Sequence, residues 1–134
     1  MAVMKSSWRT HLGTRYFYAD YSNFGRNIDA LRDEVNAADE EIEQIPGETG
    51  LVLVDIRNTV TSSDVVGLFK RSTARTKGHV LRTAVVGVKG VQRVLANAVA
   101  HFSKETLHLF DTTEAAANWL VGATDQGGVT VAPG

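Results

Sequence analysis

The feature that most constrains the fold is a short apolar run, Leu51 to Ile56, which is bounded by Gly50 and by Asn58. Its residues are nearly all β-branched or leucine, a pattern typical of a strand that is buried on both faces of a sheet. A polar stretch follows and leads into apolar residues with helical spacing. Because open α/β sheets usually place their sites at the carboxyl ends of such strands, we expect function there.

Before this strand the sequence predicts a hairpin and a long helix. Trp8 to Gly13 and Arg15 to Tyr21 have the composition of two strands with a break between them. From Asn27 to Ile45, apolar residues recur at steps of three and four and form one stripe, which indicates a helix that docks on a sheet. Asn27 can cap this helix, and Pro46 stops it.

After the central strand, helices and strands are predicted to alternate. The expected elements are a helix over Ser63 to Thr76, a strand over Val80 to Val88, a helix over Val91 to Phe102, a strand over Leu107 to Phe110 and a helix over Ala115 to Val121. Asp111 opens a stretch with the spacing of a capping box before the last helix. The order β-β-α-β-α-β-α-β-α predicts an α/β fold, a mixed sheet of about five strands covered by about four helices.

The length of 134 residues fits a single domain. We expect this domain to span residues 8–122, after an N-terminal extension over 1–7. The last residues, 123–134, have little apolar surface to bury, so they are predicted to form a flexible C-terminal tail.

Composition argues against several classes of function. The chain has no cysteine, which excludes disulfides, thiolate nucleophiles and cysteine-ligated metals. No apolar run approaches the roughly 20 residues that span a bilayer, and no secretory signal is visible, so we expect a cytoplasmic protein without a membrane span. The four histidines fall on different predicted elements, and no cofactor-binding loop is complete, so neither a metal nor a cofactor is expected. The predicted strand over Arg15 to Tyr21 is rich in aromatic residues but lacks the basic residues of a nucleic-acid-binding sheet. Its rings are therefore expected to pack in the core, and no nucleic acid is expected.

Charge is distributed unevenly along the chain. Asp29 to Glu48 holds eight acidic residues against Arg32, whereas Arg57 to Lys104 holds nine basic residues against Asp64. A bipolar molecule could steer an anionic partner or pair two copies head to tail. Alternatively, the charges lie on the solvated faces of separate helices and neutralise one another.

Hydroxyls and a carboxylate gather where the central strand hands the chain to the next helix. Thr61, Ser62, Ser63 and Asp64 are candidates for contacting a partner or accepting a phosphoryl group, because a helix N-terminus favours negative charge. The alternative is that they cap the helix and form its turn.

Two further groups of residues could carry chemistry. Asp20 and Asp55 end predicted strands, and near one another they could act as an acid–base pair or simply bond the loops. Lys89 and Gly90 follow a strand and precede a helix, the context of an anion-binding turn, although no phosphate-binding motif is complete.

The layout and several short matches resemble the STAS domain family, specifically the small bacterial proteins called SpoIIAA-like. The matching features include the central strand and the ending Leu109-Phe110-Asp111-Thr112. In anti-sigma factor antagonists of this family, an Asp-Ser-Ser-Gly-Leu segment opens the helix after the central strand, and a kinase phosphorylates one serine. With one extra residue allowed in the loop after Asp55, this chain has Asp64-Val65-Val66-Gly67-Leu68 there, so Asp64, Gly67 and Leu68 match but both serines are valines.

The resemblance implies a non-enzymatic interaction or regulatory module that binds a protein partner or a second copy of itself, with Asp55 and the Thr61 to Gly67 segment near the contact. The missing serines weigh against the phosphorylation switch. A related group, the Sec14 or CRAL-TRIO lipid-transfer proteins, suggests the alternative of a small-ligand carrier for a lipid or an anion. An enzyme is the least supported reading, since no nucleophile–base pair stands out.

Overall fold

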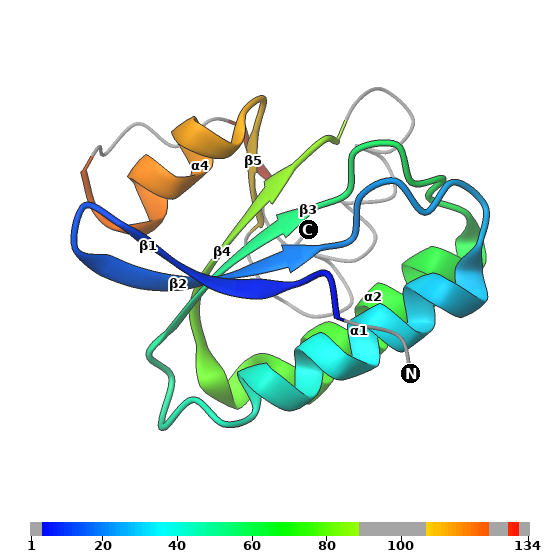
Figure 1. The fold of residues 1–134 in the computed structure, drawn as a ribbon, viewed down its shortest axis with the longest axis horizontal. Coiled ribbons are helices and arrows are strands. Elements are labelled where there is room, and N and C mark those ends of the chain that lie inside the picture. The colour runs from blue at the N-terminus through cyan, green and yellow to red at the C-terminus, as the bar shows by residue number, and fades with distance from the viewer. Residues whose placement is uncertain (1–3, 89–106, 124–128, 132–134) are drawn as a thin grey trace.

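In the computed structural model, which describes residues 4–88, 107–123 and 129–131, six strands form a single sheet (Figure 1). The strands are β1 (Ser7–His11), β2 (Thr14–Asp20), β3 (Gly50–Asp55), β4 (Val80–Val86), β5 (Leu107–Phe110) and β6 (Val129–Val131). Their order in the sheet is their order in the chain. β2 to β5 are parallel neighbours, and the two outer strands are antiparallel. The predicted α/β architecture with a mixed sheet is confirmed.

The central strand of the prediction is interior to the sheet. β3 pairs in parallel with β2 on one side and with β4 on the other. Val52 and Leu53 are buried on opposite faces, as expected for a strand that is covered on both sides. Gly50 begins the strand in a tight place, because a Cβ there would lie 2.6 Å from the carbonyl oxygen of His79.

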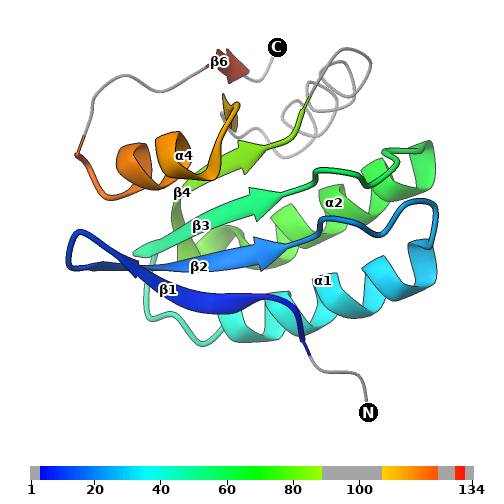
Figure 2. The same cartoon turned by 45° about the horizontal axis from the view of Figure 1, so that its top comes forward.

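Helices cover both faces of this sheet. α1 (Ile28–Ile42) and α2 (Ser63–Thr76) lie side by side on one face, and α4 (Thr113–Leu120) lies on the other (Figure 2). A 3-10 turn, η1 (Lys77–His79), links α2 to β4. No helix in the described part of the chain has both the length and the apolar character that crossing a bilayer requires.

Each face therefore has its own core. Phe17, Val52 and Val85 face α1 and α2, whose buried residues include the predicted stripe of Leu31 and Val35. On the opposite face, a second cluster joins the sheet to α4 and comprises Tyr16, Tyr18, Leu53, Ala84, Val86, Phe110, Ala116, Ala117 and Leu120. The aromatic side chains of β2 are buried, as the sequence predicted.

The structure also corrects several details. Part of the predicted tail, Val129–Val131, forms β6 and pairs with β5. The last helix is capped by Thr112, whose hydroxyl accepts a hydrogen bond from the backbone of Ala115, and not by Asp111. β4 ends at Val86 because Gly87 has a φ of +99°. The predicted helix over Val91 to Phe102 lies outside the described residues.

The acidic and basic segments meet in the layer formed by α1 and α2. The Arg75 guanidinium lies 2.6 Å from a Glu43 carboxylate oxygen and 4.0 Å from Asp39. At this point the charges of the two helices neutralise one another across the layer, as the second of the two alternatives expected.

Candidate functional site at the carboxyl ends of β2 and β3

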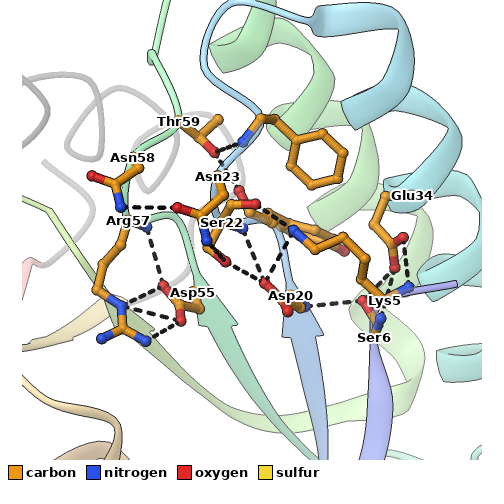
Figure 3. Close-up of polar contacts among 12 residues, drawn as sticks. Lys5, Ser6, Asp20, Ser22, Asn23, Glu34, Asp55, Arg57, Asn58 and Thr59 are labelled. Atoms are coloured by element: carbon orange, nitrogen blue, oxygen red, sulfur yellow. Dashed lines mark hydrogen bonds and ion pairs between the residues drawn. The ribbon is translucent and has the colours of Figure 1, made fainter.

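The two aspartates that end β2 and β3 lie opposite each other in the sheet. Asp20 and Asp55 are register partners in the parallel pair, and the loops that follow them lead into α1 and α2 (Figure 3). The two strand ends therefore lie side by side, which is the condition that the acid–base alternative required. Their surroundings show what each carboxylate does.

Asp55 is fully buried and bonded from three directions. Its carboxylate accepts hydrogen bonds from Arg57 Nε at 3.0 Å, Arg57 Nη2 at 2.7 Å and the Arg57 backbone at 3.1 Å. The Tyr18 hydroxyl, on the neighbouring strand, donates a short hydrogen bond to it. Burial alone would raise the pKa of Asp55, but the bonds from Arg57 and Tyr18 outweigh burial and hold it below its ordinary value.

The pKa of Tyr18 is shifted in the opposite direction. Burial, together with the hydrogen bond to Asp55, raises the pKa of the Tyr18 hydroxyl to about 12. At neutral pH, Asp55 is therefore charged and Tyr18 protonated. Neither group has a pKa near 7, which is where general acid–base catalysis is most efficient. This pair acts as a clamp between β2 and β3.

Arg57 completes the clamp on the outside of the sheet. Its side chain is 51% exposed, so one end of the ion pair faces solvent while Asp55 is enclosed. Gly87 follows β4 and leaves room for the Arg57 side chain, because a Cβ there would lie 2.7 Å from Arg57 Cγ. Glycine at position 87 thus has two reasons: the close approach of Arg57 and the positive φ.

Asp20 is committed to the loop and to the N-terminal segment. Its carboxylate accepts hydrogen bonds from the Ser22 hydroxyl at 2.5 Å and the Ser22 backbone at 3.2 Å, and it lies 3.6 Å from Lys5 Nζ. The same segment is anchored to α1 by Glu34, whose buried carboxylate accepts bonds from the backbone and hydroxyl of Ser6 (Figure 3). Of the two alternatives for these aspartates, the geometry favours loop bonding.

The loops after β2 and β3 are joined to each other. The Thr59 hydroxyl donates to the carbonyl of Tyr21 at 2.6 Å and accepts from the Phe24 backbone at 3.1 Å. Asn58 donates through its side-chain amide to Asn23 at 2.9 Å, and both asparagines have a φ near +60°. Thr59 is 3% exposed, so it fixes the loops and does not belong to their surface.

The candidate hydroxyls then open α2. Ser62 is the N-cap, and its Oγ accepts a hydrogen bond from the Val65 backbone at 3.3 Å, which makes capping its role in this structure. Ser63 and Asp64 are exposed in the first turn, while Thr61 is partly buried. Gly67 lies one turn further, where a Cβ would meet Arg71 at an ordinary 3.6 Å, so packing does not require glycine there.

A small depression lies between the starts of α1 and α2. It has a volume of about 170 Å³, and the exposed side chain of Val60, at 41%, stands at its margin. Its lining residues are Gly25, Arg26, Asn27, Ile28, Leu31, Val60, Ser62, Asp64 and Val65. We call Val60, Ser63, Asp64 and this depression the rim. It brings together part of the predicted site with the N-cap of α1.

Lys89 and Gly90 fall outside the described residues, so the proposed anion-binding turn is not tested. Sequence reasoning missed Arg57 and Tyr18 as partners of Asp55. The spacing of two between Asp55 and Arg57 was one available signal, since an arginine there can turn back onto the carboxylate. Tyr18 had none, because its contact depends on the register of β2 against β3.

Comparisons of the chain with family models, with curated proteins and with solved structures gave no match. Within the described residues, no three His, Cys, Asp or Glu side chains converge as metal ligands would.

Proposed function

We propose that this protein is a non-enzymatic interaction module of the STAS type that pairs with a second copy of itself, or with another protein, through the rim. The observation that carries the proposal is the small depression beside an exposed apolar side chain, Val60. Protein interfaces commonly place an anchoring side chain of one partner in a small pocket of the other.

The size of the depression favours a protein partner over a ligand. Sites for small molecules generally enclose about 300–1,000 Å³. At about 170 Å³, the depression suits one inserted side chain and is too small for a lipid. Its lining combines apolar residues, such as Ile28 and Leu31, with the polar ends of two helices, a mixture typical of an interface core with its margin.

The clamp beneath the rim supports the same proposal. Asp20 and Asp55 are held by Ser22, Arg57 and Tyr18, so these carboxylates stabilise the loops that carry the rim. A rigid support lowers the cost of ordering a binding surface when a partner arrives.

The phosphorylation switch of the anti-sigma factor antagonists is not part of the proposal. Val65 and Val66, which replace the two serines of that motif, are 3% and 6% exposed and pack into the core. Ser62 and Ser63 are both exposed at the start of α2; Ser62 caps the helix, and Ser63 lies beside Asp64. A phosphate on Ser63 would be attracted by the helix N-terminus but repelled by that carboxylate.

Substitution of Val60 tests the proposal. We expect the wild type to be a dimer by light scattering after size exclusion, and Val60→Lys to shift it to a monomer because the charge cannot be buried in the interface. Leu12→Lys is the matched control: Leu12 is 70% exposed in the β1–β2 turn, at the opposite end of β2 from Asp20. It should leave the mass unchanged.

Cross-linking followed by mass spectrometry tests the other form of the proposal, in which the partner is another protein and not a second copy. A cross-linked protein that is lost in Val60→Lys and retained in Leu12→Lys would support the module in its heteromeric form. A wild type that is monomeric at high concentration and forms no cross-link sensitive to Val60→Lys would refute the proposal.

A second candidate, a carrier of a small lipid or anion in the manner of the Sec14 group, is favoured by one observation. A larger cavity of about 400 Å³ lies away from the rim, next to α4. Native mass spectrometry of the purified protein tests this candidate, since a carrier is expected to retain a bound small molecule. A spectrum that shows the bare chain, together with no thermal shift across lipid and nucleotide panels, would remove it.

A further inference from the structure

The larger cavity lies at the start of β4, at the other edge of the sheet from the rim. Parallel strands begin at the same edge, so the first residues of β4 are remote from the ends of β2 and β3. Among the described residues, β5 pairs with β4 at Ala84 to Val86, and the cavity lies beside the earlier residues of β4. The cavity is lined by Glu48, Lys77, Val80, Leu81, Arg82, Thr83, His108 and Trp119.

Its volume falls in the range of ligand sites. About 400 Å³ is more than twice the volume of the depression at the rim and lies within the usual 300–1,000 Å³. Inorganic phosphate would leave much of this space empty, whereas a phosphate carried on a ring system would fill more of it.

The charges on the wall are mainly positive. Lys77 and Arg82 are both exposed, and Glu48 is the only carboxylate among the described lining residues. Arg82 Nη1 also donates a long hydrogen bond, 3.4 Å, to the Trp119 carbonyl, which places the guanidinium beside α4. A guanidinium suits recognition of a carboxylate or phosphate.

The aromatic part of the wall comes from α4 and β5. The His108 and Trp119 rings are stacked, with centroids 4.2 Å apart and planes at 29°, and the Arg82 guanidinium lies 5.6 Å from the Trp119 centroid. Burial, and secondarily the charge of Arg82, lowers the pKa of His108, so this imidazole is neutral at pH 7. The flat rings thus offer a largely uncharged surface next to the two cations.

We propose that this cavity binds a small organic anion in which a phosphate or carboxylate is attached to a planar ring, such as a nucleoside monophosphate. Arg82 and Lys77 bind the anionic group, and Trp119 contacts the ring. This cavity is the one that favours the second candidate function, so the proposal rests on that candidate and names its ligand class. It is separate from the rim, so a result at the rim does not decide it.

Nuclear magnetic resonance can test the proposal with Trp119 as its own reporter. The chain has two tryptophans, so Trp8→Phe leaves a single indole N–H signal. Adenosine monophosphate should shift this signal in a saturable way. Adenosine, which lacks the anion, and inorganic phosphate, which lacks the ring, should each bind at least about tenfold more weakly, since each loses one of the two contacts.

Substitutions assign the anion contact. In the Trp8→Phe background, Arg82→Ala should weaken adenosine monophosphate binding by about tenfold or more, the usual effect of losing a charged hydrogen bond. Arg71→Ala removes the same charge from the exposed surface of α2, on the other face of the sheet, and should leave binding within about twofold.

Three outcomes would count against the proposal. No saturable shift with adenosine monophosphate, or equal weakening by Arg82→Ala and Arg71→Ala, would overturn the proposal. Inorganic phosphate binding as tightly as the nucleotide would overturn the role of the ring.

Discussion

At the scale of single residues, Asp55 shows how a carboxylate in the expected position can serve structure. It ends a central parallel strand, which is where catalytic and binding groups often lie. Yet it is fully buried, and Arg57 and Tyr18 provide the bonds that compensate for its lost hydration. The bonds tie β2 to β3 directly below the loops that carry the rim.

The Tyr18 hydroxyl should have a measurable share in this clamp. Tyr18→Phe removes one hydrogen bond to a charged, buried acceptor and should lower the free energy of unfolding by about 1 to 2 kcal/mol in urea denaturation. Tyr16→Phe is the matched control, because Tyr16 is equally buried on the same face of β2 and no hydrogen bond of its hydroxyl is found in the described structure. If the two variants lose the same stability, the clamp does not depend on this bond.

Asp39 should make stability depend on pH. It is buried between α1 and α2, and burial raises its pKa from 3.8 to about 6 despite the hydrogen bond from Ser72. Between these pH values the folded state binds more protons than the unfolded state, so folding stability falls as the pH rises from about 4 to 6. Asp39→Asn should therefore be more stable than the wild type at pH 7 by about 3 kcal/mol, and nearly equal to it near pH 3.5.

The comparison that isolates this effect is Asp33→Asn. Asp33 is exposed on the same helix, so its substitution should change stability by less than about 0.5 kcal/mol at both pH values. Urea denaturation at several pH values measures both variants. An Asp39→Asn protein that is less stable than the wild type at pH 7 would show that the contact with Arg75 outweighs burial.

At the scale of elements, the start of β3 depends on the absence of a side chain. Gly50→Ala would place a methyl group 2.6 Å from the His79 carbonyl and 2.7 Å from Ile45 Cδ1, so the strand or its neighbours must shift. We expect a loss of about 1 to 3 kcal/mol. Gly78→Ala, where a Cβ meets nothing within 4 Å, should be close to neutral. Thermal denaturation of both variants checks this, and equal melting temperatures would contradict it.

The elements that the sequence predicted well are those with long, regular patterns. The apolar stripe of α1 and the apolar run of β3 each extend over several residues, so one exceptional residue does not obscure the pattern. Both are buried as expected. β6 has only three residues, too few to show an alternation. The cap of α4 was placed one residue early because Asp111 and Thr112 are both good capping residues, and only the backbone separates them.

The candidate site was predictable to the extent that it follows from topology. Parallel strands bring their carboxyl ends together, so the sequence could suggest that Asp20 and Asp55 lie near one another, and they are register partners. It did not predict that the depression would be shared by the N-caps Asn27 and Ser62, because this depends on how α1 and α2 pack. The His108–Trp119 stack likewise joins β5 to α4 through tertiary contacts alone.

At the scale of the whole molecule, a single sheet separates two cores. α1 and α2 cover one face, α4 covers the other, and β2 to β4 contribute side chains to both. Neither layer can bury its apolar surface without the sheet, so the two cores should unfold together. The rim lies at the carboxyl ends of the parallel strands and the larger cavity lies at the start of β4, so the same sheet supports both.

A substitution that leaves a cavity in one core should therefore also lower the unfolding midpoint that is measured in the other core. Leu31→Ala, on the face of α1, should lower the free energy of unfolding by about 2 to 4 kcal/mol because Leu31 is 1% exposed. In the Trp8→Phe background, the fluorescence of Trp119 reports on the opposite face. Its unfolding midpoint should fall together with that of the helical circular dichroism signal. Leu120→Ala, beside Trp119 in the α4 core, should shift both signals in the same way. A fluorescence transition that precedes the loss of helix in Leu120→Ala, or is unmoved in Leu31→Ala, would mean that the α4 layer opens independently of the sheet's other face.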